Sequence, residues 1–123
     1  MSSLVPHLLL RANAGSSNAA GVLRAAGYMV SRIDKDNIVE QIAGAPHVDG
    51  VVVELAALGA IRVVRGIEAR HGGKVVVVVI TPAADTVRRA LPSTAVLRPD
   101  EVDDDLVSTM DLALVAYHTR RTG

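Results

Sequence analysis

The sequence contains no cysteine, phenylalanine or tryptophan, and two tyrosines make up its entire aromatic content of 2%. The absence of cysteine excludes disulfides, thiolate metal ligands and cysteine nucleophiles. The near absence of aromatic rings removes the platforms on which single-stranded nucleic acids stack their bases. Neither positive nor negative charge is in excess, since 13 Lys and Arg residues balance 13 Asp and Glu residues. A global attraction to nucleic acid or to an anionic membrane is therefore not expected.

Long hydrophobic runs are also missing. No apolar run is longer than Val75–Ile80, which is far shorter than the roughly 20 residues that span a bilayer. The apolar stretch Leu8–Leu10 is too short for the core of a signal peptide. A chain of 123 residues with 50% hydrophobic and 21% charged residues has the size and composition of one globular domain. We therefore expect a soluble, cytoplasmic protein that is a single domain over residues 1–123.

The apolar residues alternate between short β-branched runs and longer stretches with helical spacing. Five strands are expected, at Leu8–Leu10, Tyr28–Ile33, Val51–Val53 (ending at Glu54–Leu55), Lys74–Ile80 and Thr94–Leu97. A helical stretch follows each of them. Strands that are separated by helices imply a parallel sheet with helices on both faces. The predicted fold class is α/β, with a doubly wound, five-stranded parallel sheet.

Three of the expected helices have signals at the level of single residues. Thr81 and Pro82 suit the N-cap and the first position of the fourth helix. Asp103–Asp105 place negative charge at the start of the fifth, where the helix dipole favours it. The buried stripe of the third helix is expected to contain Leu58, Ile61, Val64 and Ile67. That of the fifth is expected to contain Leu106, Met110, Ala113, Leu114 and Tyr117.

In open α/β sheets, ligands bind beyond the carboxyl ends of the strands, where the strand order reverses. The candidates for a site are therefore the residues at the strand ends, namely Arg11, Ala12, Asn13, Glu54, Thr81 and Arg98. A turn after the first strand, Gly15–Ser16–Ser17, could bind an anion through backbone N–H groups. The alternative for this turn is a plain helix cap, because the glycine spacing matches neither a dinucleotide fingerprint nor a P-loop.

The remaining polar residues show no pattern typical of a metal site or of catalysis. The acidic run Asp100–Asp105 lacks the ligand spacing of a calcium loop, and helix capping explains it better. The four histidines, at positions 7, 47, 71 and 118, are scattered along the chain. No metal or cofactor is expected, and without a nucleophile–base pair the chain is not expected to be an enzyme.

The order and spacing of four short motifs resemble the receiver domain of two-component response regulators, the CheY-like fold. The motifs are Ala26-Gly27-Tyr28, Asp49-Gly50-Val51-Val52-Val53-Glu54, Thr81 and Arg98-Pro99. The resemblance implies that Glu54 stands at the place of the aspartate that accepts phosphate. It implies that Thr81 and Arg98 stand at the places of the hydroxyl and the lysine that sense the phosphoryl group. The acidic pair that holds Mg²⁺ in the family falls on Ala12 and Asn13.

The chain departs from this family pattern where the chemistry would occur. Mg²⁺ is usually held by carboxylate oxygens, but Ala12 has no ligand atom and Asn13 only a neutral one. Glu54 is the single carboxylate and is one methylene longer than Asp. Without the metal, a transferred phosphoryl group lacks its main stabiliser. We therefore expect a pseudo-receiver in which Glu54 forms an ion pair with Arg98 or, alternatively, is a solvated carboxylate at a strand end.

The functional hypothesis is a phosphorylation-independent interaction module in signal transduction, whose partner is a signalling protein or a second copy of itself. The last two helices and the strand between them, the usual partner face in the family, would form a homodimer. This region carries charges of both signs, at Arg88, Arg89, Asp103, Asp104, Asp111 and Arg120. Two alternatives stay open: a flavodoxin-like domain that binds a small anion or a nucleotide, and a regulatory domain detached from a longer regulator. Neither nucleic acid nor a membrane is expected as a partner.

Overall fold

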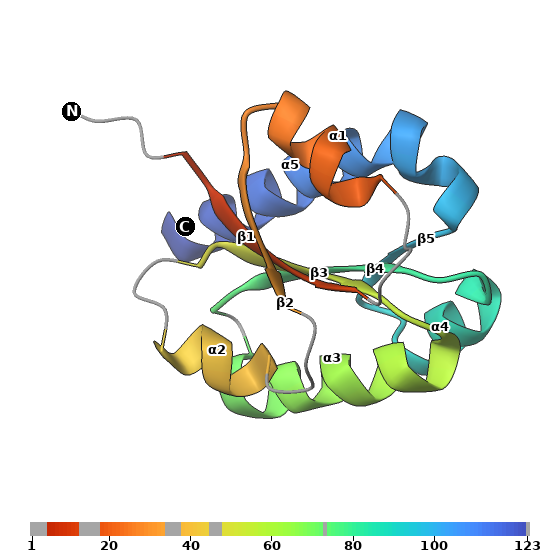
Figure 1. Ribbon diagram of the computed structural model, residues 1–123. Coiled ribbons are helices and arrows are strands. Elements are labelled where there is room, and N and C mark those ends of the chain that lie inside the picture. The colour runs from red at the N-terminus through yellow and green to blue at the C-terminus, as the bar shows by residue number, and fades with distance from the viewer. Residues whose placement is uncertain (1–4, 13–17, 34–37, 45–47, 73, 123) are drawn as a thin grey trace.

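A computed structural model describes residues 5–12, 18–33, 38–44, 48–72 and 74–122. Helices cover both faces of a central sheet, with α1 and α5 on one face and α2, α3 and α4 on the other (Figure 1). In chain order the elements are β1 (His7–Ala12), α1 (Ala19–Ala25), β2 (Met29–Ile33), α2 (Ile38–Gly44), β3 (Gly50–Glu54), α3 (Ala57–His71), β4 (Val76–Ile80), α4 (Ala84–Ala90), β5 (Ala95–Leu97), the short 3₁₀ helix η1 (Pro99–Glu101) and α5 (Val102–Thr122). The predicted alternation of strands and helices is confirmed.

The sheet has the order β2-β1-β3-β4-β5, and every neighbouring pair of strands is parallel. The chain first adds β2 on one side of β1 and then adds β3, β4 and β5 on the other side. This change of direction is what brings helices to both faces of the sheet. The predicted fold class, a doubly wound five-stranded parallel sheet, is therefore confirmed, and the strand order reverses between β1 and β3.

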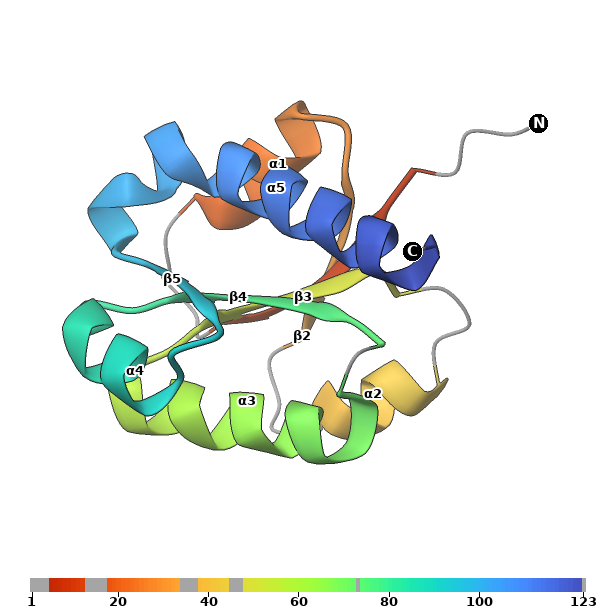
Figure 2. The same ribbon diagram turned by 180° about the vertical axis from the view of Figure 1, so that it is seen from behind.

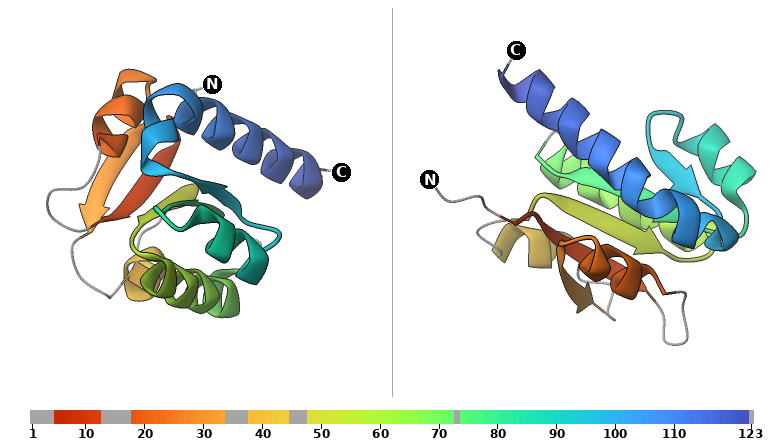
Figure 3. Two further views of the ribbon diagram at one scale, coloured as in Figure 1. Left: turned by 90° about the vertical axis from the view of Figure 1, so that its right-hand side faces the viewer. Right: turned by 90° about the horizontal axis from the view of Figure 1, so that it is seen from above.

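The hydrophobic core is divided into two clusters by the sheet (Figure 3). Side chains of successive strand residues point to opposite faces, so Val51 packs in one cluster and Val52 in the other. Val52 lies in the cluster beneath α1 and α5, with Met110 of α5. Val51 lies in the cluster above α3 and α4, with Val64 and Val87. Strands that are buried on both faces explain why the sequence shows continuous β-branched runs rather than an alternating pattern.

The predicted start of the fourth helix is wrong. α4 begins at Ala84, after a residue whose side chain makes no capping hydrogen bond. Thr81 is still part of the sheet, because its backbone N–H donates to the carbonyl oxygen of Leu97 at 2.9 Å. Thr81 is not the N-cap because Pro82 and Ala83 separate it from the first residue of α4, and Ala83 occupies the N-cap position.

The predicted buried stripe of α3 is partly wrong as well. The helix buries Ala60, Val64 and Ile67, whereas Leu58 is 78% exposed. Leu58 precedes Ala60 by two residues, which is more than half a turn around the helix. The stripe of α5 is confirmed, since Leu106, Met110, Leu114 and Tyr117 are buried and Ala113 packs against them. Asp103–Asp105 lie in the first turn of α5, as predicted.

None of the helices described is long and apolar enough to cross a membrane.

Candidate functional site

The register of the sheet aligns four strand-end residues side by side at its carboxyl edge. Ala12 of β1 pairs with Glu54 of β3, Glu54 pairs with Ile80 of β4, and Ile80 pairs with Leu97 of β5. We call these four residues the strand-end row. The sequence-predicted positions Ala12 and Glu54 are thus direct neighbours, next to the point where the strand order reverses. The strand-end row contains one carboxylate between apolar side chains.

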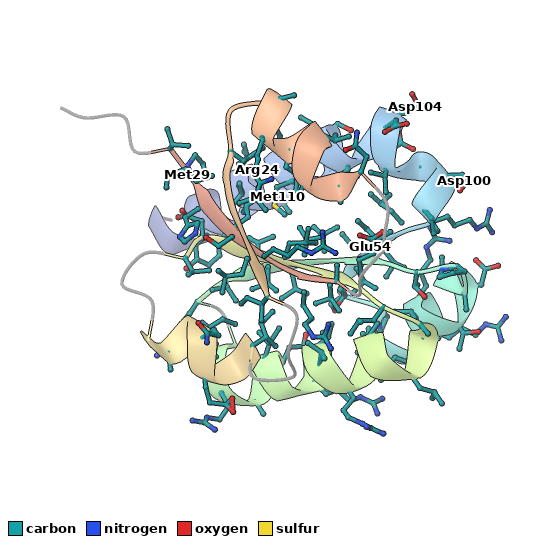
Figure 4. All side chains as sticks on the ribbon, viewed as in Figure 1. Arg24, Met29, Glu54, Asp100, Asp104 and Met110 are labelled. Carbon is teal, nitrogen blue, oxygen red and sulfur yellow. The ribbon has the colours of Figure 1, made fainter. Side chains whose placement is uncertain are left out.

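Glu54 is buried, with an exposed fraction of 9%. It lies two residues after Val52, which packs in the cluster beneath α1 and α5, so its side chain points to the same face. Figure 4 shows Glu54 at the end of the sheet, on the side that α1 and α5 cover. The alternative prediction of a solvated carboxylate at a strand end is therefore wrong, because little of Glu54 is exposed to solvent.

Arg11 is also buried, at 6% exposure, but its side chain leaves the backbone on the opposite face of the sheet. It follows Leu9 by two residues, and Leu9 packs in the cluster above α3 and α4. In the register, Arg11 lies between Ile33 of β2 and Val53 of β3. The candidate residues at the end of β1 and β3 are therefore divided between two faces rather than gathered on one.

Thr81 is fully buried immediately after β4. Its hydroxyl oxygen, Oγ1, has no hydrogen-bond partner among the residues that the structure describes. A buried polar group without a partner is unusual in proteins. The sequence suggested a capping role for this hydroxyl, and no local signal would have shown that it faces inward.

Arg98 lies one residue beyond the strand-end row and is directed toward α4. Its guanidinium Nη2 is 3.7 Å from Oδ2 of Asp85, and both side chains are more than half exposed. Its backbone N–H donates to Oε1 of Glu101 at 2.8 Å. Within the described part of the chain, the expected ion pair of Glu54 with Arg98 is not formed. The reason is the alternation of faces, which directs residue 98 away from the side on which Glu54 lies.

Several predicted site residues, Asn13, Gly15, Ser16 and Ser17, lie outside the described residues. In the part of the chain that is described, no three or more His, Cys, Asp or Glu side chains are grouped so that they could hold a metal ion. What the carboxyl edge brings together there is a buried carboxylate, a buried hydroxyl and apolar neighbours.

The outer surface of α5 carries apolar side chains that sequence reasoning missed. Leu112 and Val115 of α5 are 71% and 62% exposed, and their spacing of three residues places them on neighbouring positions of the outer surface. The signal in the sequence was that both fall outside the buried stripe. Arg88, which the sequence suggested as a charge for a partner, is already engaged within the chain. It donates to Asp85 at 3.1 Å and to the carbonyl oxygen of Val96 at 3.0 Å.

Comparison with known proteins gives matches in structure but not in sequence. No protein-family model and no curated protein sequence matches the chain. The signal receiver domain of an HD domain-containing protein from Pseudomonas fluorescens Pf-5 aligns with a TM-score of 0.78 and 16% identity, over 99% of this chain and 96% of that one. This chain has a receiver-like fold.

Two further solved structures agree. A response regulator receiver protein from Sinorhizobium medicae WSM419 aligns with a TM-score of 0.74 and 18% identity, over 94% of this chain and 99% of that one. The signal receiver domain of a putative LuxO repressor protein from Vibrio parahaemolyticus gives 0.73 and 15%, over 97% of each chain. At these identities the likeness concerns the fold alone. The receiver-like fold therefore extends over nearly the whole chain. The likeness does not assign a chemical role to the residues at the carboxyl edge of the sheet.

Proposed function

We propose that this receiver-like chain is a signalling module that binds a protein partner through α4, β5 and α5 and acts by binding rather than by catalysis. The observation that carries the proposal is the pair of exposed side chains Leu112 and Val115 on α5. A single exposed apolar residue is normal on a protein surface, whereas adjacent ones indicate contact with a partner. The partner is a signalling protein or a second copy of this chain, for which a two-fold arrangement would pair α5 with α5.

The composition of the strand-end row supports independence from phosphorylation. A phosphoryl-transfer site of this kind needs a metal ion to neutralise the charge that develops on the transferred group. Of the four residues in the row, Ala12, Ile80 and Leu97 offer no ligand atom in their side chains, so Glu54 would be a lone carboxylate. Glu54 is also buried, which restricts the approach of a phosphodonor to its oxygens.

The proposed partner face is tested by removing its apolar side chains. The double variant Leu112→Ser/Val115→Ser should weaken association by at least tenfold, because each apolar side chain buried at an interface contributes about 1.5–3 kcal/mol. Leu58→Ser on α3 is the matched control, since Leu58 is 78% exposed on the opposite layer. Sedimentation equilibrium measures self-association of the three chains. A wild-type chain that stays monomeric contradicts the homodimer, and equal weakening in the control contradicts the assignment to α5.

Phosphorylation independence is tested with acetyl phosphate and Mg²⁺. Intact mass spectrometry should show no phosphate adduct on the wild-type chain. The Glu54→Asp variant restores an aspartate and should also stay unmodified, because Ala12 still supplies no metal ligand. An adduct on the wild-type chain that hydroxylamine removes, as it removes acyl phosphates, would overturn this half of the proposal.

A second candidate function, binding of a small anion or nucleotide, is favoured by the hydroxyl of Thr81. This group is fully buried and has no partner among the described residues, so a ligand oxygen could accept its hydrogen bond. Inorganic phosphate and ATP are the probes, and the melting temperature is the measurement. A rise in melting temperature that the Thr81→Val variant abolishes would favour this function over the interaction module.

A further inference from the structure

A groove with a volume of about 770 Å³ lies at the amino ends of β4 and β5, at the opposite end of the sheet from Glu54 and Thr81. Its walls come from the last turns of α3, the first half of β4, the residues that lead into β5, and the second half of α5. Figure 2 shows the first half of β4 from this side, with α5 above it, α3 below it and β5 beginning only farther along the strand. The volume is within the usual range of binding sites, roughly 300–1,000 Å³.

The floor of the groove is an open strand edge. β5 pairs only with Val78, Val79 and Ile80 of β4. Val76 and Val77 precede this pairing and line the groove. The N–H of Val76 donates to the carbonyl oxygen of Asp49 at 3.0 Å, on the side of β3, so Val77 is the residue of this pair whose backbone faces the groove. An edge of this kind presents backbone N–H and C=O groups to an incoming chain.

The walls combine small apolar side chains with larger and polar ones, which are Ile67, His71, Ser93, Thr94 and Tyr117, and with one carboxylate. Val75, Ala95, Ala113 and Ala116 leave room above the strand edge because none of them has a large side chain. Glu68 of α3 also lines the groove. It is exposed and forms no salt bridge in the described part of the chain, so its negative charge is available to a ligand.

We propose that this groove binds a short extended peptide segment that adds as a strand to the open edge of β4 at Val77 and places a Lys or Arg side chain beside Glu68. Strand addition of this kind takes affinity from main-chain hydrogen bonds and specificity from the side chains that alternate along the peptide. A peptide is favoured over a small apolar molecule because only a backbone offers donors and acceptors in the spacing of the strand edge. The inference goes beyond the proposed function, since neither the signalling role nor the exposed pair Leu112 and Val115 is needed for it.

The test uses the full ¹⁵N-labelled chain and two acetylated, amidated probe peptides, Val-Ala-Lys-Val-Ala and Val-Ala-Glu-Val-Ala. The lysine peptide should shift the amide signals of Val77, Ala95 and Ala116 in a saturable manner and should slow hydrogen exchange at the Val77 amide. The glutamate peptide should bind more weakly. Absence of saturable shifts at these amides with either peptide would overturn the proposal. Shifts without protection of the Val77 amide would overturn strand addition and indicate a ligand that only fills the apolar space.

Two variants and one control separate charge from shape. Glu68→Gln should weaken binding of the lysine peptide by about two- to fivefold, the range of an exposed ion pair, and should remove the preference for lysine over glutamate. Glu40→Gln, an exposed carboxylate on α2, should change neither. Ala116→Leu fills the groove from its exposed wall and should abolish binding of both peptides. Equal affinities of wild type and Glu68→Gln, or undiminished binding to Ala116→Leu, would contradict the proposed placement. Failure of the Leu112→Ser/Val115→Ser test leaves these outcomes unchanged, so the two proposals fail separately.

Discussion

Exchanging Thr81 for valine replaces a buried hydroxyl by a methyl group of nearly the same size. Thr81 is 0% exposed, and its Oγ1 has no hydrogen-bond partner in the described part of the chain. A buried hydroxyl without a partner costs about 1–3 kcal/mol relative to its hydrated state in the unfolded chain. Valine removes this cost and keeps the backbone hydrogen bond from the Thr81 N–H to Leu97. We therefore expect Thr81→Val to raise the free energy of unfolding by about 1–2 kcal/mol.

Two companion variants separate the hydroxyl from the methyl group. Thr81→Ser keeps the hydroxyl and loses the methyl, so it should destabilise the chain by about 1 kcal/mol or slightly more. Thr81→Ala loses both groups, so the relief from removing the hydroxyl and the cost of the cavity should largely cancel. The expected order of stability is valine first, then wild type and alanine together, then serine. Thr86→Val on the exposed side of α4 is the control and should change stability by less than about 0.5 kcal/mol.

Urea unfolding, with the midpoint and the slope fitted separately, gives these free energies. A Thr81→Val chain that is less stable than wild type, with Thr86→Val unchanged, would refute the reasoning. It would mean that the hydroxyl of Thr81 makes a hydrogen bond in solution that is worth more than its desolvation. Repeating the series in phosphate would then show whether an anion supplies that bond.

Two further predictions concern polar contacts on the surface. Arg98→Ala should cost less than about 1 kcal/mol, because its pair with Asp85 is more than half exposed; a double-mutant cycle by urea unfolding should give a small coupling with Asp85→Asn and none with Glu54→Gln. Tyr28 donates a hydrogen bond to Asp111, and burial together with the Asp111 carboxylate raises the pKa of Tyr28 above its usual value. The folded state therefore keeps the phenol proton that the unfolded state loses above about pH 10, so stability falls as pH rises past that point. Tyr28→Phe should flatten this fall between about pH 9 and pH 11 in urea unfolding, and an unchanged slope would contradict it.

Most of the fold could be predicted because the strands are clearly marked in the sequence. Runs such as Val51–Val53 and Val75–Ile80 favour strands strongly, and the helical stretches between them require parallel crossovers. Helix ends were less predictable, because a local signal competes with tertiary contacts. Thr81 and Pro82 form a good helix start in isolation, yet the strand pairing extends to Thr81 and α4 begins only at Ala84. Leu58 fits the spacing of a buried stripe, but the smaller Ala60 is the residue that α3 turns toward the sheet.

The strand-end residues could be placed at one edge of the sheet from the sequence, but they could not be assigned to its two faces. Glu54, Thr81 and Arg98 lie at the ends of successive strands, as predicted, since Glu54 ends β3, Thr81 follows β4 and Arg98 follows β5. Two strand-end side chains can meet only if they point to the same face of the sheet. Successive residues of a strand point to opposite faces, so an error of one residue in the strand end reverses the predicted face. Leu97, not Arg98, shares the strand-end row with Glu54. Because strand ends can be predicted only to within a residue or two, the sequence could not decide against the ion pair.

The three apolar residues of the strand-end row contribute to the stability of the receiver-like fold. Ala12, Ile80 and Leu97 belong to the hydrophobic cluster beneath α1 and α5, so apolar side chains at these positions add to the core. Carboxylates at the same positions would have to be desolvated beneath the helices, which costs free energy unless a metal ion or another cation compensates. Apolar side chains at these three positions therefore favour stability, whereas a cluster of carboxylates there would oppose it.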